Sequence, residues 1–99
     1  MTSIVYSPEA LDDVQQILEF LGAQDTVLVE KFEADYRRAV ERIRNSPSGW
    51  PKVGKRIRVK IVSKRFVYGI YYRYFRRTMF IGAVFQLTRH RWRWQRRFE

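Results

Sequence analysis

The sequence predicts an α+β fold in which an N-terminal strand and an antiparallel helical hairpin pack on one face of a small, mainly antiparallel sheet. In the first half of the 99-residue chain, apolar residues recur three and four positions apart, as in amphipathic helices. In the second half they alternate with period two, as in half-buried strands. A chain of this length supports one core, so residues 1–99 form one domain.

The first half contains a short strand followed by two helices. Residues 2–6 are β-type and end at Ser7-Pro8, where Ser7 suits an N-cap and Pro8 the first helical turn. We expect this helix to stop at Gly22 and the next to begin after Asp25. So short a link makes the helices antiparallel. The inward residues are Leu11, Val14, Ile17, Leu18 and Leu21, then Val29, Phe32, Tyr36, Ala39, Val40 and Ile43, while Asp35 is assigned to the outside.

The stretch 66–88 is expected to form the central hairpin, folded at Arg76-Arg77. Arg-Arg lacks the residues that favour positive φ in a two-residue turn, so a longer loop is the alternative. With Phe75 opposite Thr78, the predicted buried face pairs Tyr74 with Met79, Tyr72 with Ile81, Ile70 with Ala83, Tyr68 with Phe85 and Phe66 with Leu87, while Phe75 and Thr78 lie on the other face.

A further strand is predicted from Lys55 onward, where Ile57, Val59 and Ile61 alternate with Arg56, Arg58 and Lys60. We expect its apolar side to join the buried face of the hairpin. The helical hairpin then covers that face, and the other face of the sheet stays open. The open face is predicted to carry Arg56, Arg58, Lys60, Tyr71, Arg73 and Gln86.

Charge is divided unequally along the chain. Residues 1–50 hold 5 Lys or Arg and 9 Asp or Glu, a net charge of −4, whereas residues 51–99 hold 15 and 1, a net charge of +14. The sum is the stated +10. Such an excess favours a polyanionic partner, either nucleic acid or an acidic protein. The alternative is a surface that is charged for solubility alone.

The composition does not favour metal binding, a bound cofactor or a membrane-spanning segment. The chain has no cysteine and one histidine, which favours neither a disulfide framework nor a metal cluster. No stretch is long and apolar enough to span a bilayer, and the first residues lack the pattern of a secretory signal. We therefore expect a cytoplasmic protein without cofactor, metal or membrane partner.

The order of these elements resembles the RelE/ParE superfamily of bacterial toxins, which are encoded beside an antitoxin. Four segments carry the resemblance: SPEALDDVQQILEFL, FEADYRRAVERIRNSPSGWPKVG, IRVKIVSKRFVYGIYYR and AVFQLTRHRWRWQRR. They are similar to the opening helix, the second helix with its Pro-Gly loop, the arginine and aromatic strands, and the final strand with its tail. The chain departs at Gln86, where many relatives have His, and at His90-Arg91, where many have Asp-Pro.

The resemblance implies one of two activities. One branch cleaves mRNA on the ribosome, and its candidate residues here are two phosphate clamps and a proton-transfer group. The other branch, like ParE, binds and poisons DNA gyrase. After Pro51 the only carboxylate belongs to Glu99, and the arginines near His90 disfavour its protonated form, so the residues favour the ParE-like branch. The nuclease candidates are Arg58 and Arg73 as clamps, Tyr71 or His90 for proton transfer, and Arg89.

We therefore expect a ParE-like toxin that binds DNA gyrase and is neutralised by an acidic antitoxin in a hetero-oligomer. The alternative is a ribosome-dependent mRNA endonuclease, and the third candidate is a basic nucleic-acid-binding module. Within the basic tail, 89–99, the tryptophans suit stacking on bases or a membrane interface, unless one packs on the sheet. Trp50 either covers the end of the helical hairpin or contacts a target. The expected target or antitoxin contacts are Arg56, Arg58, Lys60, Arg73, Gln86, Arg89, Trp92 and Trp94.

Overall fold

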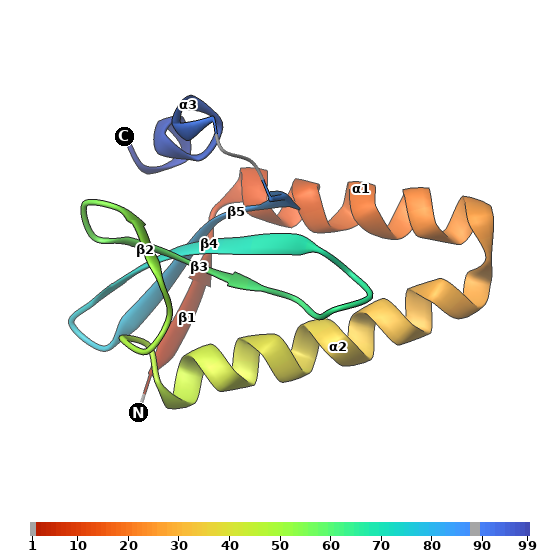
Figure 1. Ribbon diagram of the computed structural model, residues 1–99, viewed down its shortest axis with the longest axis horizontal. Coiled ribbons are helices and arrows are strands. Elements are labelled where there is room, and N and C mark those ends of the chain that lie inside the picture. The colour runs from red at the N-terminus through yellow and green to blue at the C-terminus, as the bar shows by residue number, and fades with distance from the viewer. Residues whose placement is uncertain (1, 88–89) are drawn as a thin grey trace.

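The computed structural model describes residues 2–87 and 90–99, and it confirms the α+β class. A five-stranded sheet has the order β1-β5-β4-β3-β2, with β1 parallel to β5 and the other neighbours antiparallel (Figure 1). None of the helices in the described part of the chain has the length and hydropathy of a bilayer-spanning segment. The elements are β1 (Ser3–Tyr6), α1 (Pro8–Gln24), α2 (Thr26–Asn45), β2 (Lys52–Gly54), β3 (Ile57–Ile61), β4 (Tyr68–Phe75), β5 (Thr78–Gln86), α3 (Arg91–Gln95) and the 3₁₀ turn η1 (Arg96–Phe98).

Side-chain caps begin both long helices at the predicted residues. The hydroxyl of Ser7 accepts a hydrogen bond from the backbone N–H of Ala10 at 3.0 Å, which caps α1. The carboxylate of Asp25 accepts from the N–H of Val27 at 3.0 Å, which caps α2. Because Asp25 alone separates the two helices, they form the expected antiparallel hairpin (Figure 1).

The predicted stop at Gly22 was wrong, because α1 continues to Gln24. Gly22 instead lies where the two helices approach each other closely. A Cβ atom at this position would lie 3.3 Å from Cγ2 of Val29 on α2. The glycine therefore allows close helix packing, and Asp25 ends the first helix by starting the second.

One large core lies between the helical hairpin and the sheet face that it covers, which we call the helix side. The predicted stripe of α2 packs here, with Phe32, Ala39 and Ile43 almost fully buried. On the sheet, the alternate residues Ile70 and Tyr72 of β4 are buried against it. The buried members of this core are Ala10, Ile17, Leu21, Phe32, Ala39, Ile43, Val62, Phe66, Ile70, Tyr72, Met79, Ile81 and Val84.

The central hairpin folds at Arg76 and Arg77, as predicted, and the turn has only these two residues. Their φ angles are 50° and 61°, so both adopt the left-handed conformation of a type I′ turn. This conformation is uncommon for residues other than glycine. The sheet twist favours such a turn, and the pairing of β4 with β5 holds the arginines in it.

The predicted register is right near the turn and wrong beyond it. Phe75 faces Thr78, Tyr74 faces Met79 and Tyr72 faces Ile81 as expected, but then Tyr71 faces Ala83. Gly82 is therefore an extra residue on β5, a β-bulge that shifts every later pair by one. Alternation of residue types does not reveal such an insertion. The observed pairs are Ile70 with Val84 and Tyr68 with Gln86, in place of Ile70 with Ala83 and Tyr68 with Phe85, and Leu87 is exposed.

The predicted orientation of β3 was also wrong. Arg58 lies opposite Tyr72, and Lys60 opposite Ile70, so both basic side chains project on the helix side. Ile57 and Val59 project on the other face, with Tyr71. The pattern of β3 identifies which residues share a face but not which face is which. Both faces of this sheet are covered by apolar groups, so hydrophobicity alone does not decide between them.

The other face of the sheet is covered by α3 and η1, and we call it the tail side. Trp94 of α3 is 5% exposed and stacks on Tyr71, with ring centroids 6.0 Å apart and planes 15° apart. Two glycines make room for the tail: a Cβ at Gly54 would lie 2.5 Å from Trp94, and one at Gly82 would lie 2.7 Å from Phe98. The face predicted to be open is therefore a second, smaller core, built from Ile57, Val59, Tyr71, Ala83 and Trp94, with Val53, Phe85 and Phe98 packed against them.

Candidate functional site

A cationic hollow of about 470 Å³ lies on the helix side, between α2 and the outer end of β3. Two of its arginines are four residues apart on α2, so they project from the same surface of that helix. Its lysines come from β3 and from the loop that follows. We call it the helix-side hollow. Its charged lining residues are Asp35, Arg38, Arg42, Lys60 and Lys64.

Asp35 has its carboxylate in an ion-pair network at the edge of this hollow. Arg65, from the loop between β3 and β4, donates from Nε to Oδ2 at 2.8 Å and from Nη2 to Oδ1 at 3.1 Å, and Arg38 pairs with the same group. The hydrogen bond from Arg65 is the main reason that the pKa of Asp35 is lowered to about 2. Asp35 thus fastens the loop to α2, and its assignment to the outside was wrong because its side chain is buried.

The remaining cations of the hollow lack carboxylate partners. Among the residues that the structure describes, Arg42, Lys60 and Lys64 form no ion pair. The ammonium group of Lys60 lies 4.3 Å from the centre of the Trp50 ring and donates to the carbonyl of Ile61 at 3.2 Å. Burial, and then the charge of Arg42, lower the pKa of Lys60. An anion entering this hollow would offset the repulsion between Lys60 and Arg42.

A second cationic hollow, of about 560 Å³, lies on the tail side. It is bordered by the turn between β2 and β3, by β4 and by α3. Glu99 is the one acidic residue among its lining residues. We call it the tail-side hollow. Its cationic lining residues are Lys55, Arg56, Arg73 and Arg91.

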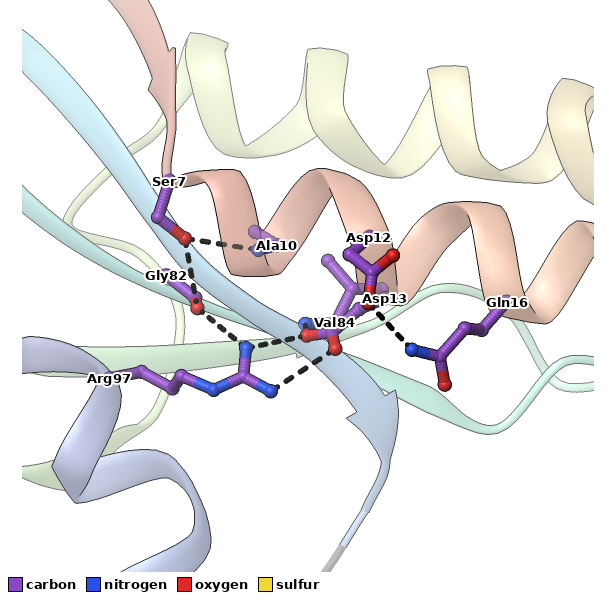
Figure 2. A network of polar contacts seen from close by, with 8 residues as sticks. All are labelled: Ser7, Ala10, Asp12, Asp13, Gln16, Gly82, Val84 and Arg97. Carbon is purple, nitrogen blue, oxygen red and sulfur yellow. Dashed lines mark hydrogen bonds and ion pairs between the residues drawn. The ribbon is translucent and has the colours of Figure 1, made fainter.

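A polar network fixes the tail to α1 and to the bulge of β5 (Figure 2). Arg97 Nη1 lies 2.8 Å from Oδ2 of Asp13, and Nη2 lies 3.1 Å from Oδ1. The same carboxylate accepts from the N–H of Val84 at 2.9 Å. The carbonyl of Gly82 accepts from Arg97 at 3.1 Å and from the hydroxyl of Ser7 at 3.3 Å. The backbone groups released by the bulge are thereby satisfied, and the tail is anchored at the same point.

The residues proposed for a nuclease are divided between the two sides of the sheet. Arg58 projects on the helix side, where its Nη1 donates to the carbonyl of Trp50 at 2.7 Å. Arg73 projects on the tail side, above the ring of Phe80. Tyr71 is only 1% exposed and lies beneath Trp94. His90 precedes α3, with its ring 6.4 Å from that of Trp92, and Arg89 lies outside the described residues.

The residues proposed for binding are distributed over both sides of the sheet. The expected common basic face was wrong, because Arg58 and Lys60 lie on the helix side and Arg56 and Arg73 on the tail side. Gln86 lines a third hollow of about 590 Å³, between α1 and the tail. The two tail tryptophans differ: Trp92 is 60% exposed, whereas Trp94 is buried in the tail-side core. Trp50 packs against the helix-side core.

Sequence reasoning missed Arg38, Arg42, Lys64, Lys55 and Arg91. The i, i+4 spacing of Arg38 and Arg42 was a usable signal, because such residues share one surface of a helix. The other three flank strands or begin a helix, and only the tertiary fold brings them to a hollow. Within residues 2–87 and 90–99, no group of three potential metal ligands occurs.

Comparison with known proteins identifies the fold. No protein-family model and no curated protein matches the sequence. A solved structure described as the chromosomal ParDE TA system from P. aeruginosa contains a chain that superposes with a TM-score of 0.63. The sequence identity is 17%, and the match covers 89% of this chain and 98% of that chain. This likeness shows that the chain has a ParE-like fold, as its motifs predicted.

Proposed function

We propose that this protein is the toxin of a type II toxin–antitoxin system, ParE-like, which inhibits growth by binding DNA gyrase. A co-encoded acidic antitoxin neutralises it by forming a hetero-oligomer with it. The observation that carries the proposal is the fold shared with a chain of a ParDE system over 89% of this chain. The sequence motifs resemble the same superfamily, and the two cationic hollows suit acidic partners.

The arrangement of the arginines supports binding over cleavage of RNA. A nuclease of the kind considered above needs its two clamps beside one phosphate. Arg58 and Arg73 instead project from opposite faces of the sheet. The candidate base Tyr71 is covered by Trp94, so a substrate would reach it only after the tail had moved.

The acidic antitoxin segment fits the helix-side hollow. Arg42, Lys60 and Lys64 supply charge that no carboxylate balances within the described residues. The hollow also borders an open edge of β3. The last hydrogen bond between β3 and the chain next to it on this edge runs from the N–H of Val59 to the carbonyl of Pro51, at 3.0 Å. The strand continues to Ile61, so in the described part of the chain its end has no neighbouring strand on that edge. An extended acidic segment would complete this edge with main-chain hydrogen bonds and place carboxylates among the cations.

A gyrase assay with purified protein tests the target. We expect the protein to inhibit supercoiling of relaxed plasmid and to trap cleaved DNA. Full supercoiling at saturating protein would contradict the gyrase part of the proposal. Primer extension on translated mRNA after induction tests the alternative, because codon-dependent cuts that disappear in Arg73→Ala would favour an mRNA endonuclease.

Titration with the acidic protein encoded beside the gene tests the partner and its position. The helix-side pair Arg42→Gln plus Lys64→Gln should weaken binding at least about tenfold at low salt, because truncating charge contacts of an interface raises the dissociation rate. The tail-side pair Lys55→Gln plus Arg91→Gln removes the same charge from the other face and is the matched control. Equal losses from both pairs would show that only net charge matters and would refute the helix-side position.

A further inference from the structure

Three elements far apart in the chain bring four cations to the tail-side hollow. Lys55 and Arg56 form the turn between β2 and β3, Arg73 lies on β4, and Arg91 begins α3. Within the described residues, none of the four forms an ion pair. Like charges gathered around one hollow raise its affinity for anions. Glu99 is the one acidic residue that borders it.

The hollow suits a ligand that carries several phosphates. At about 560 Å³ it is larger than a single phosphate requires, and its cations come from three elements of the chain. Arg73 is held in place above the ring of Phe80, 5.6 Å from the ring centre. Lys55, Arg56 and Arg91 are exposed, so their side chains can follow an irregular chain of phosphates. A nucleic-acid backbone is such a chain of phosphates.

An exposed aromatic residue is the chain neighbour of one of these cations. Trp92 follows Arg91 directly and is 60% exposed, more than any other large hydrophobic residue in the described part of the chain. Trp94 points into the tail-side core, and residues two apart on a helix project in nearly opposite directions, so Trp92 points away from the sheet. An indole in this position can stack on a base only if that base is unpaired.

We propose that the tail side binds single-stranded nucleic acid, with its phosphates in the tail-side hollow and one base stacked on Trp92. The binding is independent of base sequence, because phosphate contacts and the face of a base are common to all nucleotides. The site lies on the face of the sheet opposite the helix-side hollow, so the proposal stands apart from that of the antitoxin. It requires no cleavage of the strand.

Fluorescence anisotropy with labelled oligothymidylate of about 12 nucleotides tests the site on the full chain. Four contacts to a single strand predict a slope of about −2.8 for the logarithm of affinity against that of salt concentration. The same slope means about a 50-fold loss between about 50 and 200 mM salt. Oligouridylate of equal length distinguishes RNA from DNA as the source of the phosphates.

Variants on the two faces separate this site from general charge attraction. Lys55→Gln plus Arg91→Gln should reduce the slope by about 1.4, because two contacts are lost. Arg42→Gln plus Lys64→Gln makes the same change in net charge on the helix side and should leave the slope unchanged. All four residues are exposed, so neither pair is expected to unfold the protein. Equal effects of the two pairs would overturn the proposal.

Substitutions at Trp92 test whether a base stacks on this ring, which attraction between charges alone would not require. Trp92→Ala should weaken single-strand binding about tenfold, whereas Trp92→Phe should retain most of it. Binding of a duplex of equal length should not change in either variant, because paired bases offer no face for stacking. Single-strand binding that ignores Trp92→Ala, or a duplex that loses as much as the single strand, would overturn the proposal.

Discussion

The two sides of the sheet are built from the same three parts in different proportions. Each side has an apolar core, an aspartate–arginine pair and a cationic hollow. The helix-side core has buried residues from both long helices and from two strands, β4 and β5, whereas the tail contributes one buried residue, Trp94, to the tail-side core. The buried contacts that stabilise the domain are therefore mainly on the helix side, and the tail packs on the other face of the sheet with a smaller buried contact.

The aspartate–arginine pairs show how the uneven charge of the sequence is used within the fold. Asp35 and Asp13 lie in the acidic half of the chain, and their partners Arg65 and Arg97 lie in the basic half. Each pair therefore joins a helix of the first half to a segment of the second. Part of the charge that these pairs leave unbalanced lines the two hollows, where we place the partners of the protein.

The largest expected effect comes from truncating the helix-side core. Phe32 is 1% exposed and contacts the rings of Tyr36, Phe66 and Tyr68. Phe32→Ala should lower the free energy of unfolding by about 3 to 5 kcal/mol, through lost burial and a residual cavity. Urea unfolding followed by circular dichroism measures it, with Val27→Ala, an exposed position on the same helix, as the control. A loss below about 1 kcal/mol would contradict the central role of this core.

A smaller loss of stability is expected when Trp94 is displaced from the tail-side core. A Cβ at Gly54 would lie 2.5 Å from Trp94, so Gly54→Ala should push the indole out of the tail-side core. The expected loss of stability is about 1 to 3 kcal/mol, typical of overpacking. Amide exchange should rise across α3 and η1, while the amides of α2 stay protected. If instead α2 loses protection to the same degree, the two sides unfold as one unit and the comparison fails.

The sequence predicted the elements well because local rules determine them. Ser7 and Asp25 cap the helices, the stripe of α2 is the buried one, and the hairpin turns at Arg76-Arg77. These features depend on neighbouring residues, which are visible in the chain. The fold class followed from them, since an amphipathic hairpin and an alternating second half leave few arrangements.

The faces of the sheet were not predictable in the same way. The bulge at Gly82 depends on polar partners, Asp13 and Arg97, that are about 70 and 15 residues away in the chain. The orientation of β3 depends on the tail, because Trp94 makes the second face apolar. The candidate site was affected most, since a reversed strand divides one predicted basic face into two hollows on opposite sides.

The smallest expected effect tests the ion pair between Asp35 and Arg65 by its dependence on pH. The pKa of Asp35 is about 2, below its ordinary value of 3.8, mainly because of the hydrogen bond from Arg65. The unfolded chain therefore binds a proton at higher pH than the folded one, so the stabilisation is complete above about pH 4 and is lost as the pH falls to about 2. The size of this stabilisation at neutral pH is about 1 to 2 kcal/mol, after allowance for solvent around the half-exposed Arg65.

Asp35→Asn should be less stable than the wild type by this amount at neutral pH, and the difference in the free energy of unfolding should disappear as the pH falls from about 4 to about 2. Glu30→Gln removes an exposed carboxylate from the same helix and controls for net charge. A constant difference between Asp35→Asn and the wild type from pH 7 to about pH 2 would show that the ion pair does not stabilise the loop.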